Sequence, residues 1–234
     1  MTLLVFDCDG VLVDSEGIAL AVLAQALAGL DLRITPAECR RRFMGKSRRD
    51  VSAEIEALLG RRVPQGFGEA MKAQLFARLA RELRPVAGVP ETLARLPYAA
   101  CVASSSEPDR IALSLDVTGL APLFEGRTFS ASEVRRGKPA PDLFLHVAKS
   151  LGVSPHAAIV IEDSPAGIIA ARSAGMAAIG FAGASHADAQ LANALAAAGA
   201  DAVLLKMADL PMTIERIRAA RRPRRATAIR DRAP

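Results

Sequence analysis

The chain has 234 residues, 51% of them hydrophobic, and its 30 lysines and arginines outnumber 25 acidic residues, which gives a net charge of +5. This length is enough for one well-buried core with a smaller second unit. The positive charge is concentrated in residues 212–234, which contain eight arginines against Glu215 and Asp231. Because this segment has no aromatic side chain for base stacking, we interpret it as a solvated tail rather than a nucleic-acid-binding one.

Composition also indicates in which cellular compartment the protein is expected. No apolar run approaches the roughly 18 residues that a membrane-spanning helix needs, and no secretory signal precedes the first apolar strand. The three cysteines, Cys8, Cys39 and Cys101, form neither a CxxC pair nor a metal-binding spacing, which fits a reducing environment. We therefore expect a cytoplasmic monomer that binds neither membrane nor nucleic acid.

Short apolar segments separated mostly by helical patterns predict a parallel sheet buried on both faces. The predicted strands are Leu3–Phe6, Ala99–Ala103, Ala158–Ile161, Ala177–Phe181 and Ala202–Leu205. Helices are expected to begin near Pro108 and Pro165, with Ser106 and Ser164 as the capping residues. The predicted fold class is therefore α/β, with a doubly wound parallel sheet.

Residues 16–84 differ from the rest of the chain because they contain helical patterns and no convincing strand. The predicted helices are Ile18–Leu30, Pro36–Phe43, Arg49–Leu59 and Phe67–Arg84. The proline and glycine of the segment 85–89 then return the chain to the sheet. We expect a core formed by residues 1–15 and 85–210, a helical unit at 16–84, and a basic tail at 211–234.

Two carboxylates, Asp7 and Asp9, directly follow the first predicted strand. An Asp9-Gly10 turn is the simpler alternative, but it does not account for Asp7. Burying unpaired carboxylates costs several kcal/mol, so a cation is expected to compensate them. One aspartate can attack a phosphoryl group, and the second can protonate the leaving oxygen and later activate water.

Three later segments place polar groups at strand ends or just before helices. Residues 104–106 are serines, whose hydroxyl and N–H groups form either an anion site or an ordinary helix cap. Lys138 precedes a proline. Glu162 and Asp163 end another strand and offer oxygen ligands for Mg²⁺, although an acidic pair is also common at a helix N-terminus. Neighbouring strand ends meet at the switch point of a doubly wound sheet, so these groups are expected to converge on Asp7.

The stretch 7–16, DCDGVLVDSE, resembles the first motif of the haloacid dehalogenase-like hydrolase superfamily. The serines 104–106, the pattern K-P-x-P-x-x-F from Lys138, and the strand end at Glu162 and Asp163 resemble its other three motifs. The resemblance covers about residues 1–205 and implies a Rossmann-like core with the helical cap of subfamily I. Most members are Mg²⁺-dependent phosphatases with an aspartate nucleophile, and the dehalogenases of the family lack the second aspartate.

The resemblance also implies roles for individual residues. Asp7 is the expected nucleophile and a metal ligand, and Asp9 is the expected acid and base that also gives the metal its backbone carbonyl. Ser104 and Lys138 are expected to hold phosphoryl oxygens, with Ser105 contacting the substrate. Asp163 is expected to bind Mg²⁺, and Glu162 to bind it directly or through water.

The helical unit is expected to select the substrate. Its loop 44–49 carries three cations, of which Lys46 and Arg48 are candidates to bind a distal carboxylate or hydroxyls of the substrate. The alternative is a surface helix N-terminus. A P-loop is excluded because Arg40 stands where its first glycine is required. His186, which follows the fourth predicted strand, is a candidate for the site entrance.

The sequence thus predicts a Mg²⁺-dependent phosphatase acting on a small phosphorylated metabolite, a sugar or sugar-acid phosphate. Overall it is similar to bacterial sugar-phosphate and 6-phosphogluconate phosphatases. One alternative is a phosphomutase like the β-phosphoglucomutases, but Ala19 stands where those enzymes carry a hinge histidine. The other is a non-catalytic domain whose basic tail binds nucleic acid. Phosphonatases need a Schiff-base lysine in the cap, and residues 16–30 contain none.

Overall fold

The computed structural model describes residues 2–43, 48–124 and 126–221. Within these ranges a six-stranded sheet forms the centre, with strand order β3-β2-β1-β4-β5-β6 and every pair parallel. The strands are β1 (Leu3–Phe6), β2 (Ala99–Ser104), β3 (Thr128–Ser130), β4 (Ala158–Glu162), β5 (Ala177–Phe181) and β6 (Ala202–Leu204). The expected doubly wound α/β fold is confirmed.

Strand β3 is the one that the sequence pattern did not predict. It has only three residues, Thr128 is exposed, and the strand pairs with β2 alone at the edge of the sheet. Three residues with one exposed position carry too little apolar pattern to be distinguished from a loop. The five predicted strands all exist within one residue of their expected bounds.

Helices cover both faces of the sheet because successive strand residues point to opposite sides. Leu4 and Phe6 of β1 belong to one buried cluster and Leu3 and Val5 to the other. The first cluster packs against α5 (Val89–Leu93), α6 (Pro108–Val117) and α10 (Leu210–Arg221). The second packs against α7 (Asp142–Ser150), α8 (Pro165–Ser173) and α9 (Ala189–Ala197).

Helix α10 changes the expected extent of the core. The sequence placed a tail from residue 211, but α10 runs to Arg221, and its Ile214 and Ile217 are buried in the first cluster. The high arginine content hid these two apolar residues, three apart on one helix face. Residues 211–221 therefore belong to the core, and the remaining part of the expected tail lies outside the described residues.

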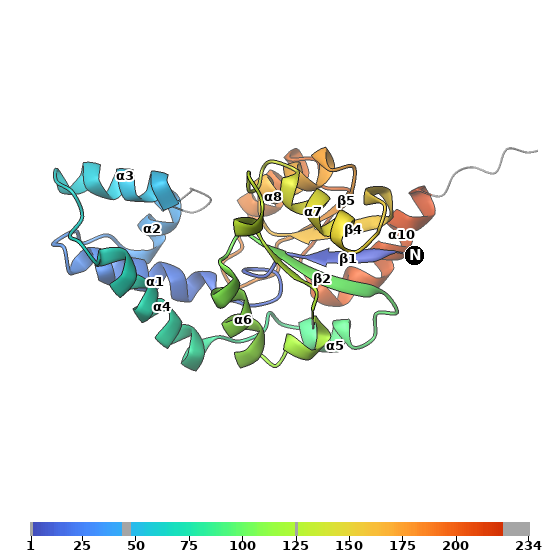
Figure 1. Cartoon of the computed structure of the whole chain (residues 1–234), viewed down its shortest axis with the longest axis horizontal. Helices are drawn as coiled ribbons and strands as arrows, with labels where there is room; N and C mark the ends of the chain where they lie inside the picture. Colours follow the sequence, from blue (N-terminus) through green and yellow to red (C-terminus); the bar gives the residue numbers. More distant parts are fainter. Residues whose placement is uncertain (1, 44–47, 125, 222–234) are drawn as a thin grey trace, which may run out of the picture.

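A separate helical unit, called the cap here, comprises α1 (Glu16–Ala28), α2 (Pro36–Phe43), α3 (Arg48–Leu59) and α4 (Phe67–Glu82). Figure 1 shows it beyond the end of the sheet toward which β1 points. The cap has its own small cluster of buried side chains, formed by Leu20, Leu27, Cys39, Phe43 and Ile55. Its four helices lie close to the predicted ranges.

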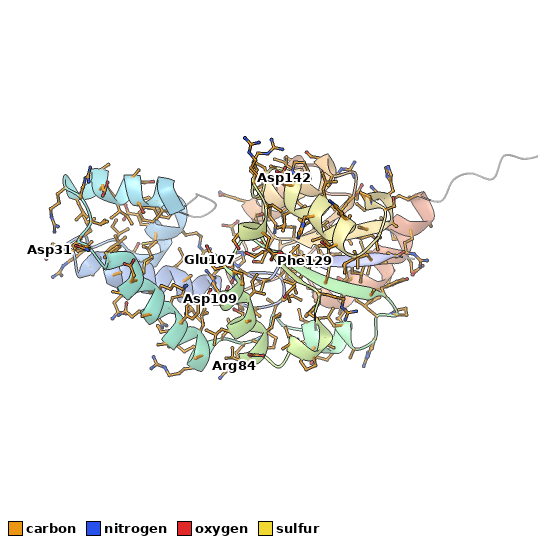
Figure 2. All side chains as sticks on the ribbon, viewed as in Figure 1. Asp31, Arg84, Glu107, Asp109, Phe129 and Asp142 are labelled. Carbon is orange, nitrogen blue, oxygen red and sulfur yellow. The ribbon has the colours of Figure 1, made fainter. Side chains whose placement is uncertain are left out.

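The two chain segments that join cap and core run side by side. Val13 forms a bridge with Pro85, and the Asp14 N–H donates to the Arg84 carbonyl at 3.0 Å. Lys72 of α4 pairs with Asp109 of α6 at 2.6 Å, and Figure 2 shows Asp109 at this junction. The cap is thereby anchored over the carboxyl ends of the strands. Among the described residues, no helix is both apolar enough and long enough to cross a membrane.

Candidate active site

The carboxyl ends of β1, β2 and β4 form the floor of the candidate site. Strand β1 lies between β2 and β4, so Asp7 is flanked by Ser104 at the end of β2 and Glu162 at the end of β4. The Asp7 N–H continues the ladder by donating to the Ile161 carbonyl at 2.9 Å. The register of the parallel strands therefore brings together residues that are far apart in sequence, as the switch-point argument predicts.

Lys138 connects all three strand ends. Its Nζ donates to Asp7 Oδ1 at 2.8 Å, to the Ala103 carbonyl at 3.0 Å and to the Glu162 carboxylate. The side chain is only 4% exposed. Burial would lower the pKa of this amine, but Asp7 and Glu162 together raise it above its usual value. Lys138 is therefore a fixed positive charge beside Asp7.

Glu162 is held on both sides. Lys138 donates to one carboxylate oxygen, and the backbone N–H and hydroxyl of Ser164 both donate to the other at 2.9 Å. Ser164 also caps α8 by accepting from the Gly167 N–H at 3.0 Å, as expected from the sequence. A Cβ on Gly167 would lie 2.0 Å from the Glu162 carboxyl carbon, so glycine is required for this packing.

Three carboxylates meet where a metal ion is expected. Oxygen atoms of Asp7, Glu162 and Asp163 lie within 4.8 Å of one another. Burial, together with the neighbouring carboxylates, raises the pKa of Asp7 well above its usual value. Burial is also the main cause that raises the pKa of Asp163 to about 6. An all-oxygen donor set whose charges are costly to bury fits Mg²⁺. Because Lys138 and Ser164 already donate hydrogen bonds to both carboxylate oxygens of Glu162, the oxygens of Asp7 and Asp163 are more accessible to a metal ion.

Asp9 is surrounded by donors. Arg110 of α6 donates to Oδ1 at 2.6 Å, Ser106 donates to Oδ2 at 2.6 Å, and the Ser15 hydroxyl donates to Oδ1. Burial would raise the pKa of Asp9, but Arg110 and the two serines lower it below its usual value. Asp9 is therefore held as a carboxylate in this structure.

Ser106 corrects one sequence expectation. Helix α6 begins at Pro108 with Glu107 at the capping position, where no side-chain cap bond forms. The Ser106 hydroxyl is instead used by Asp9, and its backbone N–H donates to Ser104 Oγ at 3.1 Å. Ser104 itself is buried beside Asp7 at the end of β2, whereas Ser105 is exposed.

His186 completes the rim of the site. It is buried, and its Nε2 lies 3.2 Å from Asp163 Oδ2. Burial would lower the pKa of the imidazole, but the Asp163 carboxylate raises it. A Cβ on Gly10, which has φ +76°, would come within 2.0 Å of Asp163 Oδ2 and 2.9 Å of His186 Cε1. Gly10 therefore permits both the turn after β1 and the close approach of these two side chains.

Comparison with known proteins identifies the family. The family model for haloacid dehalogenase-like hydrolases matches residues 1–175. The chain belongs to this family. The 6-phosphogluconate phosphatase of Escherichia coli is 30% identical over 175 residues, covering 73% of this chain and 78% of the relative. The phosphorylated carbohydrates phosphatase of Thermotoga maritima is 31% identical, covering 75% of this chain and 82% of the relative.

Comparison with solved structures identifies the same family. A haloacid dehalogenase-like protein of unknown function from Agrobacterium tumefaciens superposes with a TM-score of 0.84 at 38% identity. The match covers 93% of this chain and 99% of that one. The expectation of a hydrolase with the core and helical cap of this superfamily is therefore confirmed.

The predicted cap contacts stay predictions. Lys46 lies outside the described residues, and Arg48 is the first residue of α3. Within the described ranges, Arg40 of α2 is a cap residue that contacts the core beside the candidate site, because its Nη1 donates to the His186 carbonyl at 2.7 Å. In the sequence this arginine is one of three consecutive arginines, and nothing distinguishes it from its neighbours.

Sequence reasoning also missed Arg110 and Ser15. Arg110 lies in the first turn of α6, where a charged residue is ordinarily solvent-facing, and Ser15 precedes α1 at its capping position. Neither follows an apolar strand, so the signal that identified Asp7 and Asp163 is absent. The one clue was proximity in sequence to Asp9 and to the serines 104–106.

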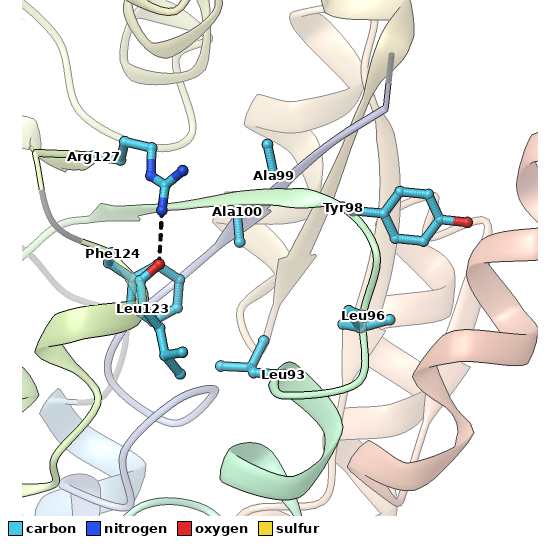
Figure 3. Close-up of a pocket in the computed structure, with 8 residues that line it drawn as sticks. All are labelled: Leu93, Leu96, Tyr98, Ala99, Ala100, Leu123, Phe124 and Arg127. Carbon is cyan, nitrogen blue, oxygen red and sulfur yellow. Dashed lines mark hydrogen bonds between the residues drawn. The ribbon is translucent and has the colours of Figure 1, made fainter.

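A second hollow lies away from these groups. A cavity of about 140 Å³ lies beside the start of β2, whereas Ser104 lies at the other end of that strand. Figure 3 shows the residues that line this cavity. It is lined by Leu93, Leu96, Tyr98, Ala99, Ala100, Leu123, Phe124 and Arg127. Arg127 donates to the Leu123 carbonyl across it at 2.9 Å. This mostly apolar hollow contains none of the carboxylates and is separate from the candidate active site.

Proposed function

We propose that this chain is a Mg²⁺-dependent phosphatase that hydrolyses a sugar or sugar-acid phosphate through an aspartyl-phosphate intermediate. The observation that carries the proposal is Asp7 at the end of β1, with Lys138 on one of its oxygens and Asp9 two residues further along. A carboxylate that keeps one oxygen next to a fixed ammonium retains the other for in-line attack on phosphorus.

In the first step Asp7 forms an O–P bond while the bond from phosphorus to the sugar oxygen breaks. Asp9 gives its proton to that leaving oxygen. Arg110 and the two serines favour the carboxylate form of Asp9, so the protonated form needs an opposing charge. The incoming phosphoryl dianion supplies it, because a nearby negative charge raises the pKa of a carboxyl group.

In the second step Asp9, now a carboxylate, removes a proton from water as its oxygen attacks phosphorus. The Asp7–phosphorus bond breaks and inorganic phosphate is released. Lys138 compensates the charge that returns to Asp7. One residue thus acts as acid and then as base, which balances protons over the cycle.

Asp7 and Asp163 would hold the metal ion, with the backbone carbonyl of Asp9 as a further donor. Glu162 would bind the ion directly or through a water molecule. When bound, Mg²⁺ would neutralise charge on the phosphoryl oxygens and orient the group for in-line transfer. Ser104 and Lys138 would contact the remaining phosphoryl oxygens. Ser105, exposed at the mouth, together with Lys46 and Arg48 from the cap, would contact the rest of the substrate.

The substrate class is supported by the names of the relatives. One curated relative acts on 6-phosphogluconate and another on phosphorylated carbohydrates. Both align over about three quarters of this chain. A phosphomutase is disfavoured because Ala19 of α1 has no group that can transfer a proton.

Phosphate release from sugar, sugar-acid, nucleotide and short-chain phosphates tests this function, measured with Mg²⁺ and with EDTA. We expect release that requires Mg²⁺ and is fastest for one group of sugar or sugar-acid phosphates. Absence of release from every compound would overturn the proposal. Interconversion of hexose 1- and 6-phosphates with a bisphosphate primer would then favour the phosphomutase.

A further inference from the structure

Buried polar atoms without partners occur where the cap meets the core. Among the residues that the structure describes, five buried side-chain polar atoms lack a hydrogen-bond partner, and three of them are here: Arg40 Nε, Arg110 Nε and His186 Nδ1. Buried polar groups are normally satisfied, so a cluster of exceptions needs an explanation. A missing polar ligand is the simplest one.

Contacts place these three residues near one another at the junction of cap and core. Arg40 donates to the backbone of His186, and the His186 ring lies against Asp163. Gly10 adjoins both Asp163 and His186, and the neighbouring Asp9 binds Arg110. The three unpartnered atoms are therefore buried near one another, next to Asp9 and Asp163 of the proposed phosphoryl site, and Arg40 is the one that the cap contributes.

Among the residues that the structure describes, Arg40 is a cation at this junction that has no carboxylate partner. Lys138 is paired with Asp7 and Glu162, and Arg110 is paired with Asp9. Arg40, by contrast, has a neutral carbonyl as its partner, and no described carboxylate lies within ion-pair distance of it. A half-buried guanidinium with an orphaned N–H is suited to an anion, because its planar fork matches a carboxylate.

The other charges near Arg40 limit which anion can bind to it. The carboxylates of Asp9 and Asp163 both act electrostatically on Glu16, which lies near the two of them. A second phosphate dianion would add more repulsion than one guanidinium offsets, whereas a carboxylate adds a single charge. The available cation and the surrounding carboxylates therefore favour a monoanionic group at the far end of the substrate.

We propose that Arg40 binds a carboxylate of the substrate, so that the enzyme selects phosphorylated sugar acids over the corresponding neutral sugar phosphates. This inference rests on the proposed function, since it places the phosphoryl group of the same molecule at Asp7. The His186 ring supports the site from the core side: its backbone carbonyl positions Arg40, and its unpartnered Nδ1 faces a hydroxyl of the same substrate.

Equilibrium binding separates this inference from catalysis. The D7N variant cannot form the aspartyl-phosphate, so its affinity for intact compounds can be measured by calorimetry with Mg²⁺ present. The two probes are 6-phosphogluconate and glucitol 6-phosphate, open-chain molecules that differ at carbon 1, where the acid has a carboxylate and the hexitol a hydroxyl. Arg40→Gln is introduced into D7N, and Arg41→Gln, an exposed neighbour on the same helix, is the matched control.

We expect D7N to bind the acid at least about tenfold more tightly than the hexitol, the effect of a charge-assisted contact. Arg40→Gln should abolish this preference while changing the affinity for the hexitol less than about twofold, and Arg41→Gln should change neither. Equal affinity of D7N for both probes, binding of neither, or equal losses for both in Arg40→Gln would each overturn the inference. Phosphate release by the wild-type enzyme is scored separately: its absence refutes the proposed function, while the binding preference still decides the role of Arg40.

Discussion

The core side and the cap side of the candidate site are built differently. On the core side each charged group has several partners: Lys138 has three acceptors and Asp9 has three donors. On the cap side Arg40 reaches the core through one hydrogen bond and keeps an unpartnered Nε. The core side is thus already arranged for one reaction, whereas the cap side is arranged to be completed by a ligand.

The difference follows from how the two parts fold. Strand register fixes the core residues, since Asp7, Ser104 and Glu162 end three adjacent parallel strands. The cap has its own small hydrophobic cluster and joins the core through two adjacent segments near Val13 and Pro85. Substitutions on the cap surface therefore leave the strand ends unchanged, and the substrate can differ between relatives while the reaction stays the same.

The largest expected effect is that of replacing Asp7, which lies on the core side of the candidate site. Asp7→Asn should lower kcat by at least about 10⁴-fold, because the nucleophile is lost. The fold should survive, since the raised pKa shows that the buried site tolerates a neutral side chain better than a carboxylate. Phosphate release and thermal unfolding measure the two effects. Asp116→Asn, on the exposed face of α6, is the control, and substantial activity in Asp7→Asn would contradict the assignment.

The second effect concerns the residue at which the core ends. Truncation after Leu210 removes the buried Ile214 and Ile217, and losing a buried isoleucine side chain costs about 2–5 kcal/mol. Truncation after Arg221 removes neither. Urea unfolding should therefore show a large loss of stability for the shorter chain and almost none for the longer one. Equal stability of the two truncated chains would show that α10 is dispensable.

Lys138 provides a third test, because it belongs to the core network. Lys138→Met leaves Asp7 and Glu162 buried without their cation, which should cost about 3–5 kcal/mol of unfolding free energy. The matched control is Lys72→Met, which breaks the exposed pair with Asp109 and should cost less than about 1 kcal/mol. Similar losses in the two variants would mean that Lys138 is not the central charge of the site.

The smallest effect concerns Asp163 in the absence of metal. Its pKa is raised by burial to about 6 in the folded protein, so the folded state binds this proton more tightly than the unfolded state. Stability is therefore lost as pH rises from about 4 through 6. A rise of about two pKa units corresponds to about 3 kcal/mol, so Asp163→Asn should raise the melting temperature of the metal-free protein by about 6–12 °C at pH 7.5 and leave it unchanged near pH 4.

The same variant should no longer be stabilised by added Mg²⁺, whereas the wild-type protein should be, because binding to the folded state alone raises the melting temperature. Thermal scans at both pH values, with Mg²⁺ and with EDTA, give all four comparisons. A lower melting temperature of metal-free Asp163→Asn at pH 7.5 would contradict the electrostatic account.

The sequence predicted the fold and the convergence of polar groups at the strand ends, because both depend on the same pattern of apolar strands. An apolar strand that ends in charge, as before Asp7 and before Glu162 and Asp163, is unusual enough to indicate chemistry. The helices of the cap were equally readable from their periodicity.

The features that the sequence did not predict depend on tertiary contacts or on weak local patterns. Arg110 lies on a helix and Arg40 within a run of arginines, and each becomes part of the site only through a residue distant in sequence. Strand β3 is too short to show a pattern, and the charge of α10 concealed its apolar face. Composition and periodicity report local structure, so they do not reveal these long-range partners.

The central claim is that Asp7 attacks phosphorus, and one measurement tests it directly. Wild-type enzyme is mixed with a ³²P-labelled substrate identified by the phosphate-release assay, quenched in acid within milliseconds, and digested for peptide mapping. The account predicts label on the peptide that contains Asp7, lost on treatment with hydroxylamine and absent from Asp7→Asn. Label on another peptide would contradict it, as would no label at any time point while phosphate release continues.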